Sequence, residues 1–197
     1  MKKLFLATGN EGKIKEMRKL LADLEVEIVT SKEIGEIPEV VEDGETLREN
    51  AIKKAKEVAD YTDLATIADD TGLIVNVLDA KPGVYSARYA GINATDEDNN
   101  QKLLKELAEV SQKERKAYFK TVIALINPDG KLKTVEGICK GYITNQPMGE
   151  NGFGYDPLFI PEGYDSSFAQ LSSEEKNKIS HRAKALNKMK EYLKSNF

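Results

Sequence analysis

The chain has 197 residues, 40% of them hydrophobic, which suffices for a substantial core within the usual size of one domain. Its formal net charge of −4 at pH 7 argues against a broad nucleic-acid surface, although it leaves room for a locally basic pocket. The single cysteine, Cys139, excludes an intramolecular disulfide and a cysteine-based metal cluster.

No apolar run approaches the length that is needed to cross a bilayer. The four apolar residues after Lys3 are too few for a signal peptide. No internal repeat or low-complexity segment interrupts the chain. We therefore expect a soluble, cytoplasmic protein that folds as a single domain over residues 1–197.

The first candidate site is a loop near the N-terminus. Residues 2–7 predict a strand, and the apolar residues after the loop recur at helical spacing, namely Ile14, Met17, Leu20, Leu21 and Leu24. Backbone N–H groups at a helix start attract anions, and Lys13 adds a full positive charge. The loop lacks Walker A spacing, and many such turns carry Gly and Asn for conformational reasons. It is either a phosphate site or an ordinary turn, with the sequence Thr8-Gly9-Asn10-Glu11-Gly12-Lys13.

An acidic loop follows a second predicted strand over residues 26–29. Thr46 then predicts the cap of a helix with one apolar face, formed by Leu47, Ala51, Ala55, Val58 and Ala59. Four acidic residues of the loop compete for any metal-binding role, and a solvated acidic loop is the alternative. These residues are Glu39, Glu42, Asp43 and Glu45.

Two adjacent carboxylates follow the buried strand that is predicted over residues 64–68, and another strand is predicted over 73–78. Because side chains alternate along a strand, Asp69 and Asp70 should point to opposite faces. Carboxylates at the carboxyl end of a strand suit Mg²⁺, which prefers hard oxygen ligands. The alternative is a solvated turn, because Asp, Thr and Gly all favour turns.

The second half of the chain contains a glycine-rich aromatic loop. Thr95 predicts a helix cap, and residues 117–126 and 132–143 predict two long strands around an Asn-Pro-Asp-Gly turn. In the loop 149–157, glycines permit close approach of a ligand and aromatic rings offer stacking faces. Asp156 could accept hydrogen bonds from a base edge. An ordinary structural loop could have the same composition.

Cationic residues gather near the C-terminus. Ser173 to Lys176 resembles a displaced capping box at the start of a short helix. His181, the only histidine, stands beside Arg182 at the predicted start of the last helix. A lone histidine is more often structural than functional, but Lys176, His181 and Arg182 together predict a cationic cluster for an anionic ligand.

Five motifs in this order resemble the inosine triphosphate pyrophosphatase family, and the resemblance runs from Leu4 to about Leu193. They are Thr8-Gly9-Asn10-x-x-Lys13, Ala68-Asp69-Asp70-Thr71-Gly72-Leu73, Pro82-Gly83-Val84-Tyr85-Ser86-Ala87-Arg88, Gly152-Phe153-Gly154-Tyr155-Asp156-Pro157 and Ser180-His181-Arg182. The resemblance implies an α/β fold, with an elongated mixed β-sheet flanked by helices and two lobes around a central nucleotide cleft.

The resemblance also implies the activity: Mg²⁺-dependent hydrolysis of ITP, dITP and XTP to the monophosphate and pyrophosphate, which cleanses the nucleotide pool. Glu42 and Asp70 would hold the metal, Asp70 would be the general base, and Asp69 would support the metal site or the loop. The expected nucleotide contacts are Thr8, Gly9, Asn10, Glu11, Gly12, Lys13, Thr71, Phe153, Gly154, Tyr155, Asp156, Lys176, His181 and Arg182.

Three other classes stay open at this point: a Maf-type pyrophosphatase, a phosphatase of different regiochemistry, and a non-catalytic nucleotide sensor. The resemblance further implies a homodimer. Residues 82–90, with two tyrosines and an arginine, are the candidate interface because these residue types are enriched in interface cores. An ordinary structural loop is the alternative for this segment.

Overall fold

The structure is a computed structural model that describes residues 2–196. Six strands form one sheet in the order β2-β1-β3-β4-β5-β6. Backbone contacts divide the chain into two compact units. Unit 1 contains the residues up to Asp70, Thr121–Gly137 and those from Arg182 on, and unit 2 contains Thr71–Lys120 and Ile138–His181. The prediction of a single domain is not tested by this division and stays a prediction.

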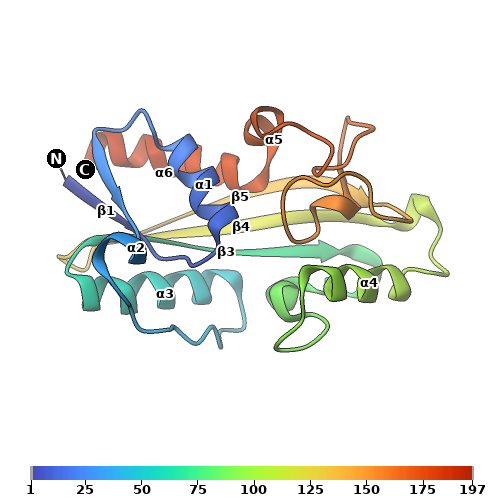
Figure 1. Cartoon of the computed structure of the whole chain (residues 1–197), viewed down its shortest axis with the longest axis horizontal. Coiled ribbons are helices and arrows are strands. Elements are labelled where there is room, and N and C mark those ends of the chain that lie inside the picture. The colour runs from blue at the N-terminus through green and yellow to red at the C-terminus, as the bar shows by residue number, and fades with distance from the viewer. Residues whose placement is uncertain (1, 197) are drawn as a thin grey trace. The chain divides into compact units, whose positions relative to one another are not determined.

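The sheet is mixed, as predicted. Strand β1 pairs in parallel with β2 and β3, whereas β5 and β6 are antiparallel. Figure 1 shows α1 and α6 on one side of the unit 1 strands and α3 on the other. The elements with residues in unit 1 are β1 (Lys2–Leu6), α1 (Glu11–Leu20), β2 (Val26–Val29), α2 (Ser31–Ile34), α3 (Leu47–Thr62), β3 (Ala65–Val75), β4 (Lys116–Ile126), β5 (Leu132–Ile143) and α6 (His181–Asn196).

Unit 2 contains the C-terminal part of β3 from Thr71 on, the N-terminal part of β4 up to Lys120 and the C-terminal part of β5 from Ile138 on, together with short helices. The remaining α-helices and strand are α4 (Asp96–Glu106), β6 (Phe159–Pro161) and α5 (Ser173–Ile179). Its 3-10 helices are η1 (Asn76–Leu78), η2 (Gly83–Arg88), η3 (Gln112–Glu114) and η4 (Asp156–Leu158).

Each unit has its own hydrophobic core. In unit 1 the apolar faces of α1 and α6 pack on the strands β1, β3 and β4. This core includes Met17 and Leu186 from the helices and Leu6, Ile67 and Ile123 from the strands. In unit 2 the core contains Leu73, Leu103, Phe119, Phe159 and Phe168. Full burial of one such side chain contributes about 1.5–3 kcal/mol, so these residues dominate the stability of their unit.

Capping boxes start the helices α2, α3, α4 and α5. Thr46 and Thr95 cap α3 and α4, as the sequence predicted. The capping box of α5 uses Ser172 with Glu175, so the prediction that placed it at Ser173 was wrong by one residue. Ser172 and Glu175 have the three-residue spacing that the motif requires, and Ser173 is the first helical residue.

The largest correction concerns β3. The sequence predicted two strands, over residues 64–68 and 73–78, with the carboxylates at the end of the first, but β3 runs without interruption from Ala65 to Val75, and Asn76–Leu78 is a 3-10 helix. β3 lies between β1 and β4 in the sheet, and its pairing with β1 covers Ala65 to Ile67, ahead of the two aspartates. Its place in the sheet overrides the turn preference of single residues. The carboxylates therefore lie within a strand rather than at its end.

Two smaller differences concern segments next to helices. Leu24, predicted as part of the first helix, lies beyond the end of α1 but packs on the unit 1 core. The sequence predicted no helix in residues 82–90, yet Gly83–Arg88 forms a 3-10 helix. Among residues 2–196, no helix has both the length and the apolar character to span a membrane.

Candidate active site

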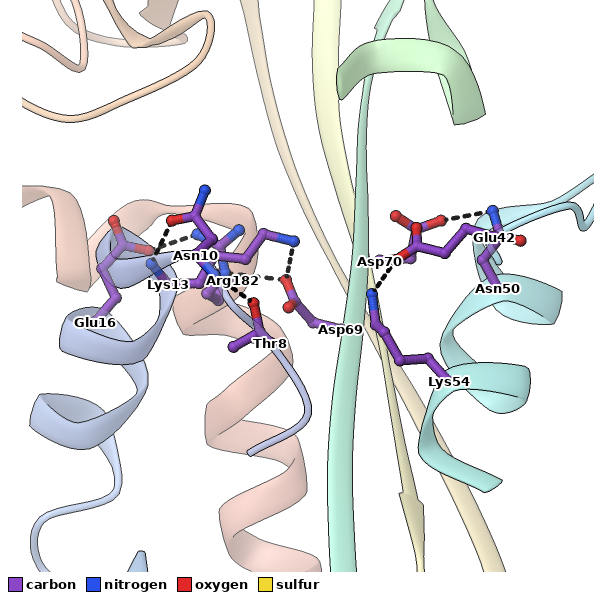
Figure 2. Close-up of polar contacts among 10 residues, drawn as sticks. All are labelled: Thr8, Asn10, Lys13, Glu16, Glu42, Asn50, Lys54, Asp69, Asp70 and Arg182. Atoms are coloured by element: carbon purple, nitrogen blue, oxygen red, sulfur yellow. Dashed lines mark hydrogen bonds and ion pairs between the residues drawn. The ribbon is translucent and has the colours of Figure 1, made fainter. Parts of the chain in front are cut away.

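Asp69 and Asp70 point to opposite faces of β3, which confirms the predicted alternation. Figure 2 shows Asp69 directed toward Lys13 and Arg182, and Asp70 directed toward the side chains of α3. The two carboxylates therefore have different neighbours and different chemistry, although they are adjacent in the chain.

The loop between β1 and α1 is shaped by its own side chains. Asn10 caps α1, because its Oδ1 accepts a hydrogen bond from the Lys13 backbone N at 3.0 Å. The Thr8 hydroxyl accepts one from the Asn10 backbone N at 3.2 Å. Gly9 is exposed, and a Cβ at this position would meet nothing within 4 Å. The helix start is thus accessible to an anion of the kind that such termini attract.

Lys13 joins this loop to β3. Its Nζ lies 3.1 Å from Asp69 Oδ2, and only 17% of the side chain is exposed. Burial lowers the pKa of the Lys13 ammonium, and the charge of Asp69 opposes this shift. The ion pair therefore holds a lysine beside the open helix start.

Asp69 is fully buried and has two cationic neighbours. Its Oδ2 accepts a hydrogen bond from Arg182 Nε at 3.2 Å, and Arg182 Nη1 also pairs with Glu16 on α1. Burial alone would raise the pKa of the Asp69 carboxyl, but the charges of Lys13 and Arg182 hold it well below its usual range. Asp69 therefore stays ionised and orients Lys13, and it is a poor proton acceptor.

Asp70 has the opposite electrostatic balance. Its Oδ2 accepts a hydrogen bond from Asn50 Nδ2 at 3.1 Å. Burial, followed by the nearby charge of Glu42, raises the pKa of the Asp70 carboxyl above its ordinary value. A carboxylate with a raised pKa accepts a proton more readily, which suits a general base.

Glu42 is the acidic loop residue that lies next to Asp70. It is half-buried and forms an ion pair with Lys54 Nζ at 2.5 Å (Figure 2). Burial alone would lower the pKa of the Lys54 ammonium, but Asp69 and Glu42 raise it. Of its competitors, Asp43 pairs with Lys53 at 2.6 Å, and Glu39 and Glu45 are exposed.

The donor set on the α3 side of β3 fits Mg²⁺. No cluster of three or more Asp, Glu, His or Cys side chains capable of holding a metal occurs in the described part of the chain. Mg²⁺, however, commonly takes one or two protein carboxylates and completes its shell with waters and substrate phosphates. Glu42 and Asp70 supply that number, and their mutual repulsion is relieved by a cation between them.

Unit 2 contains a second cluster, formed by Phe153, Asp156 and Lys176. Asp156 Oδ2 accepts hydrogen bonds from Lys176 Nζ at 2.7 Å and from the Phe153 backbone N at 2.9 Å. Lys176 Nζ also lies 4.8 Å from the centroid of the Phe153 ring. A Cβ on Gly152, whose φ is +82°, would come within 2.1 Å of Asp156 Oδ2, so only glycine fits there.

Other predicted nucleotide contacts are occupied with packing or backbone bonds. The Tyr155 ring is buried, and its hydroxyl donates to the Ser86 carbonyl at 2.8 Å. The Gly154 N–H donates to Asp96 Oδ2 at 2.7 Å. His181 is buried and stacks on Phe119, with ring centroids 4.5 Å apart. Phe153 is therefore the partly exposed aromatic ring of this loop.

The residues of the predicted cationic cluster have different partners and fall in both units. Lys176 and His181 belong to unit 2, where Lys176 pairs with Asp156, whereas Arg182 belongs to unit 1 and pairs with Asp69 and Glu16. Thr71 is a half-exposed residue of β3 directly after Asp70. The site also contains three residues that the sequence did not single out, namely Glu16, Asn50 and Lys54.

An α/β fold in which strand carboxylates and buried lysines lie near an open helix start is typical of proteins that bind phosphorylated ligands. The chain belongs to the Ham1 family, whose sequence model matches residues 4–192. This finding confirms the predicted family.

Relatives and solved structures agree with this assignment. The chain is 48% identical to a dITP/XTP pyrophosphatase of Bacillus licheniformis, over 98% of each chain. It is 50% identical to a dITP/XTP pyrophosphatase of Caldanaerobacter subterraneus subsp. tengcongensis, over 98% of this chain and 96% of that one. A HAM1 protein from Coxiella burnetii has the same fold, with a TM-score of 0.90, 41% identity, and 99% and 100% of the two chains covered. The Ham1 protein of Staphylococcus aureus gives 0.87 at 40% identity over both full chains.

Proposed function

We propose that the chain is a pyrophosphatase that hydrolyses dITP, ITP and XTP to the nucleoside monophosphate and pyrophosphate. Relatives named dITP/XTP pyrophosphatase align with nearly its whole length. The observation that carries the proposal is the pair on β3: Asp69 stays ionised beside Lys13, while Asp70 has a raised pKa beside Glu42. One residue positions a phosphate-binding lysine, and its neighbour accepts a proton.

The triphosphate is assigned to the start of α1. The backbone N–H groups of Gly9, Glu11 and Gly12 and the Lys13 ammonium supply positive potential there, and the open space at Gly9 allows close approach. Thr71, which follows Asp70 in β3, is assigned a further phosphate contact. Phosphoryl transfer depends mainly on such positioning and charge neutralisation.

Glu42 and Asp70 would hold Mg²⁺. When bound, Mg²⁺ neutralises phosphate charge and lowers the pKa of water. Asp70 takes the proton from the water whose oxygen attacks the α-phosphorus. The bond from that phosphorus to the bridging oxygen breaks, and pyrophosphate leaves. Lys54, now paired with Glu42, stays close enough to balance the two carboxylates.

The base is assigned to Phe153 and Lys176. The partly exposed Phe153 ring offers a stacking face, and the Lys176 ammonium, fixed by Asp156, is a donor for a 6-keto oxygen. Adenine carries an amino group at that position, which is itself a donor and cannot accept this hydrogen bond. Mismatches of this kind can reduce turnover about 10⁴-fold. Contacts of Gly154, Tyr155, Asp156, His181 and Arg182 with the nucleotide stay predictions.

A product assay tests this function. The protein is incubated with Mg²⁺ and ITP, XTP, dITP, GTP or ATP, and pyrophosphate and orthophosphate are measured separately. We expect pyrophosphate and monophosphate from the first three nucleotides and little product from ATP, whose base lacks the 6-keto oxygen. Orthophosphate as the product would identify a phosphatase of different regiochemistry, and binding without turnover would identify a sensor.

We also propose that the protein is a homodimer and that it works in the cytoplasm, where the nucleotide pool is made and used. The candidate interface is the segment from Pro82 to Ala90. Its Tyr85 is 58% exposed, and Arg88 lies over the Tyr85 ring with its Cζ 5.3 Å from the centroid. An exposed tyrosine held by an arginine suits an interface anchor.

A further inference from the structure

Asn50 is a buried amide that touches two parts of the proposed metal site. It lies on α3 and is only 1% exposed. Its Oδ1 accepts a hydrogen bond from the Gly44 backbone N at 2.8 Å, and its Nδ2 donates to Asp70 Oδ2 at 3.1 Å. Gly44 is two residues after Glu42, so one side chain connects the loop that carries Glu42 with the carboxylate of Asp70 (Figure 2).

The chain contains a second asparagine in the same local setting. Asn50 and Asn99 each follow a capping box, at the fourth residue of α3 and α4 respectively. Asn99 is also buried, and its Oδ1 also accepts from a backbone N–H of the preceding loop, that of Ala90, at 2.8 Å. Both asparagines therefore share one structural role, a hydrogen bond that fixes the preceding loop to the start of the helix.

The two asparagines differ in what their amide nitrogens contact. Asn99 Nδ2 donates to the Ala87 backbone carbonyl at 3.2 Å, whereas Asn50 Nδ2 donates to the ionisable carboxylate of Asp70. The loop bond is common to both residues, so it does not explain the contact with Asp70. That contact is the feature that calls for a functional account.

We propose that Asn50 is a positioning residue that sets the geometry of the two metal-binding carboxylates. This inference rests on the proposed assignment of Mg²⁺ to Glu42 and Asp70. The amide donor fixes Asp70 by one oxygen and leaves the carboxylate negative. The bond to Gly44 fixes the loop next to Glu42. A partner in the second layer that orients a metal ligand commonly changes metal affinity by about 10–100-fold when it is removed.

The chemistry of the site explains why an amide occupies this position. A lysine or arginine in contact with Asp70 would compete with the metal for its charge, and a carboxylate would repel it. An uncharged amide donates a hydrogen bond without doing either. Gly44 makes the approach possible, because a Cβ there would come within 2.7 Å of Asn50 Oδ1.

The test is Mn²⁺ binding to the nucleotide-free protein, measured by the loss of the electron paramagnetic resonance signal of free Mn²⁺. Four proteins are compared: wild type, Asn50→Ala, Asn99→Ala and Asp70→Asn. Asn99→Ala loses an equivalent buried loop bond and is the matched control. Asp70→Asn tests the metal assignment itself, and circular dichroism establishes that each variant is folded.

We expect Asn50→Ala to bind Mn²⁺ about tenfold more weakly than wild type, while Asn99→Ala stays within about twofold. A loss below about fivefold in Asn50→Ala, or an equal loss in Asn99→Ala, overturns the inference. If Asn50→Ala does not fold, Gly44→Ala decides, because its Cβ displaces Asn50, and unchanged Mn²⁺ affinity in Gly44→Ala overturns the inference. Equal Mn²⁺ binding by wild type and Asp70→Asn refutes the metal assignment instead, so the two failures are distinguishable.

Discussion

Lys13 Nζ lies 3.1 Å from Asp69 Oδ2, so the lysine at the start of α1 is held by a fully buried carboxylate on β3. This contact joins the proposed phosphate-binding loop to the strand that carries the proposed general base. The two adjacent aspartates differ in their electrostatic surroundings: the charges of Lys13 and Arg182 hold the pKa of Asp69 low, whereas burial and the charge of Glu42 raise the pKa of Asp70.

Asp70→Asn should reduce turnover of ITP by about a hundredfold or more, because the variant lacks a proton acceptor. Its folding should not suffer. Burial and the charge of Glu42 disfavour the ionised Asp70 carboxylate, so a neutral amide there leaves the free energy of unfolding unchanged or higher. Single-turnover kinetics and urea unfolding of the same preparation measure both effects. Near wild-type turnover would remove Asp70 from the mechanism.

Asp69→Asn should behave differently and should destabilise the protein. The substitution removes the buried negative charge beside Lys13 and Arg182, and Arg182 keeps its contact with Glu16. Breaking a buried ion pair in this way costs about 3–5 kcal/mol. Urea unfolding measures the loss, with Asp70→Asn as the adjacent control. Equal stability of the two variants would contradict the claim that Asp69, unlike Asp70, stabilises the fold through its ion pairs.

The ion pairs of Asp69 with Lys13 and Arg182 should make the stability of the protein depend on pH. The pKa of Asp69 is depressed in the folded state, so its contribution to stability is complete above its unfolded pKa of 3.8 and is lost as the pH falls through the lower folded value. The difference in unfolding free energy between wild type and Asp69→Asn should therefore be constant from neutral pH to about pH 5 and should shrink only below about pH 4. A difference that already shrinks near pH 6 would argue against a depressed pKa.

Base selection should depend on Lys176 rather than on Lys13. Lys176→Met keeps the aliphatic stem but removes the donor, so the ratio of kcat/KM for ITP over ATP should fall about tenfold. The matched control is Lys178→Met, an exposed residue of the same helix. Lys13→Met should slow both nucleotides alike, because they share the triphosphate.

Arg182→Ala should also affect ITP and ATP alike. The sequence predicted Arg182 as a nucleotide contact, but its bonds to Asp69 and Glu16 place its effect at the ion pair that orients Lys13. The specificity ratio from the same assay measures this. Selective loss of discrimination in Arg182→Ala would instead assign the residue to base recognition.

The proposed dimer depends on the exposed Tyr85. Tyr85→Glu should weaken self-association, because two-fold symmetry places the new charge opposite its own copy. Tyr61, which is 60% exposed, is the control of equal exposure in unit 1, and Tyr61→Glu should leave the mass unchanged. Sedimentation velocity measures both variants. A wild-type protein that sediments as a monomer at micromolar concentration contradicts the dimer.

Local signals made much of the fold predictable. The capping positions Thr46 and Thr95, the alternation at Asp69 and Asp70, and the two strands that became β4 and β5 follow from spacing and turn chemistry. The continuity of β3 could not be predicted, because it depends on the place of the strand in the sheet, beside strands that are distant in sequence. Local preference for a turn gives way to that placement.

The site was predictable where the motif itself carries the chemistry, as at Lys13 and Asp70. It was not predictable where a residue acts through a distant partner. Asn50 and Lys54 look like ordinary polar positions of an amphipathic helix, and only the placement of α3 against β3 brings them to Asp70 and Glu42. Glu16 is likewise explained only by its contact with Arg182, far along the chain.

Hydrolysis of ITP in ¹⁸O-labelled water tests the central claim most directly. Attack of water on the α-phosphorus, with Asp70 as the base, places one labelled oxygen in IMP and none in pyrophosphate. We therefore expect mass spectrometry to find labelled IMP and unlabelled pyrophosphate in equal amounts, with product formation almost abolished in Asp70→Asn. Label in pyrophosphate, or orthophosphate as the main product, would contradict the proposed chemistry.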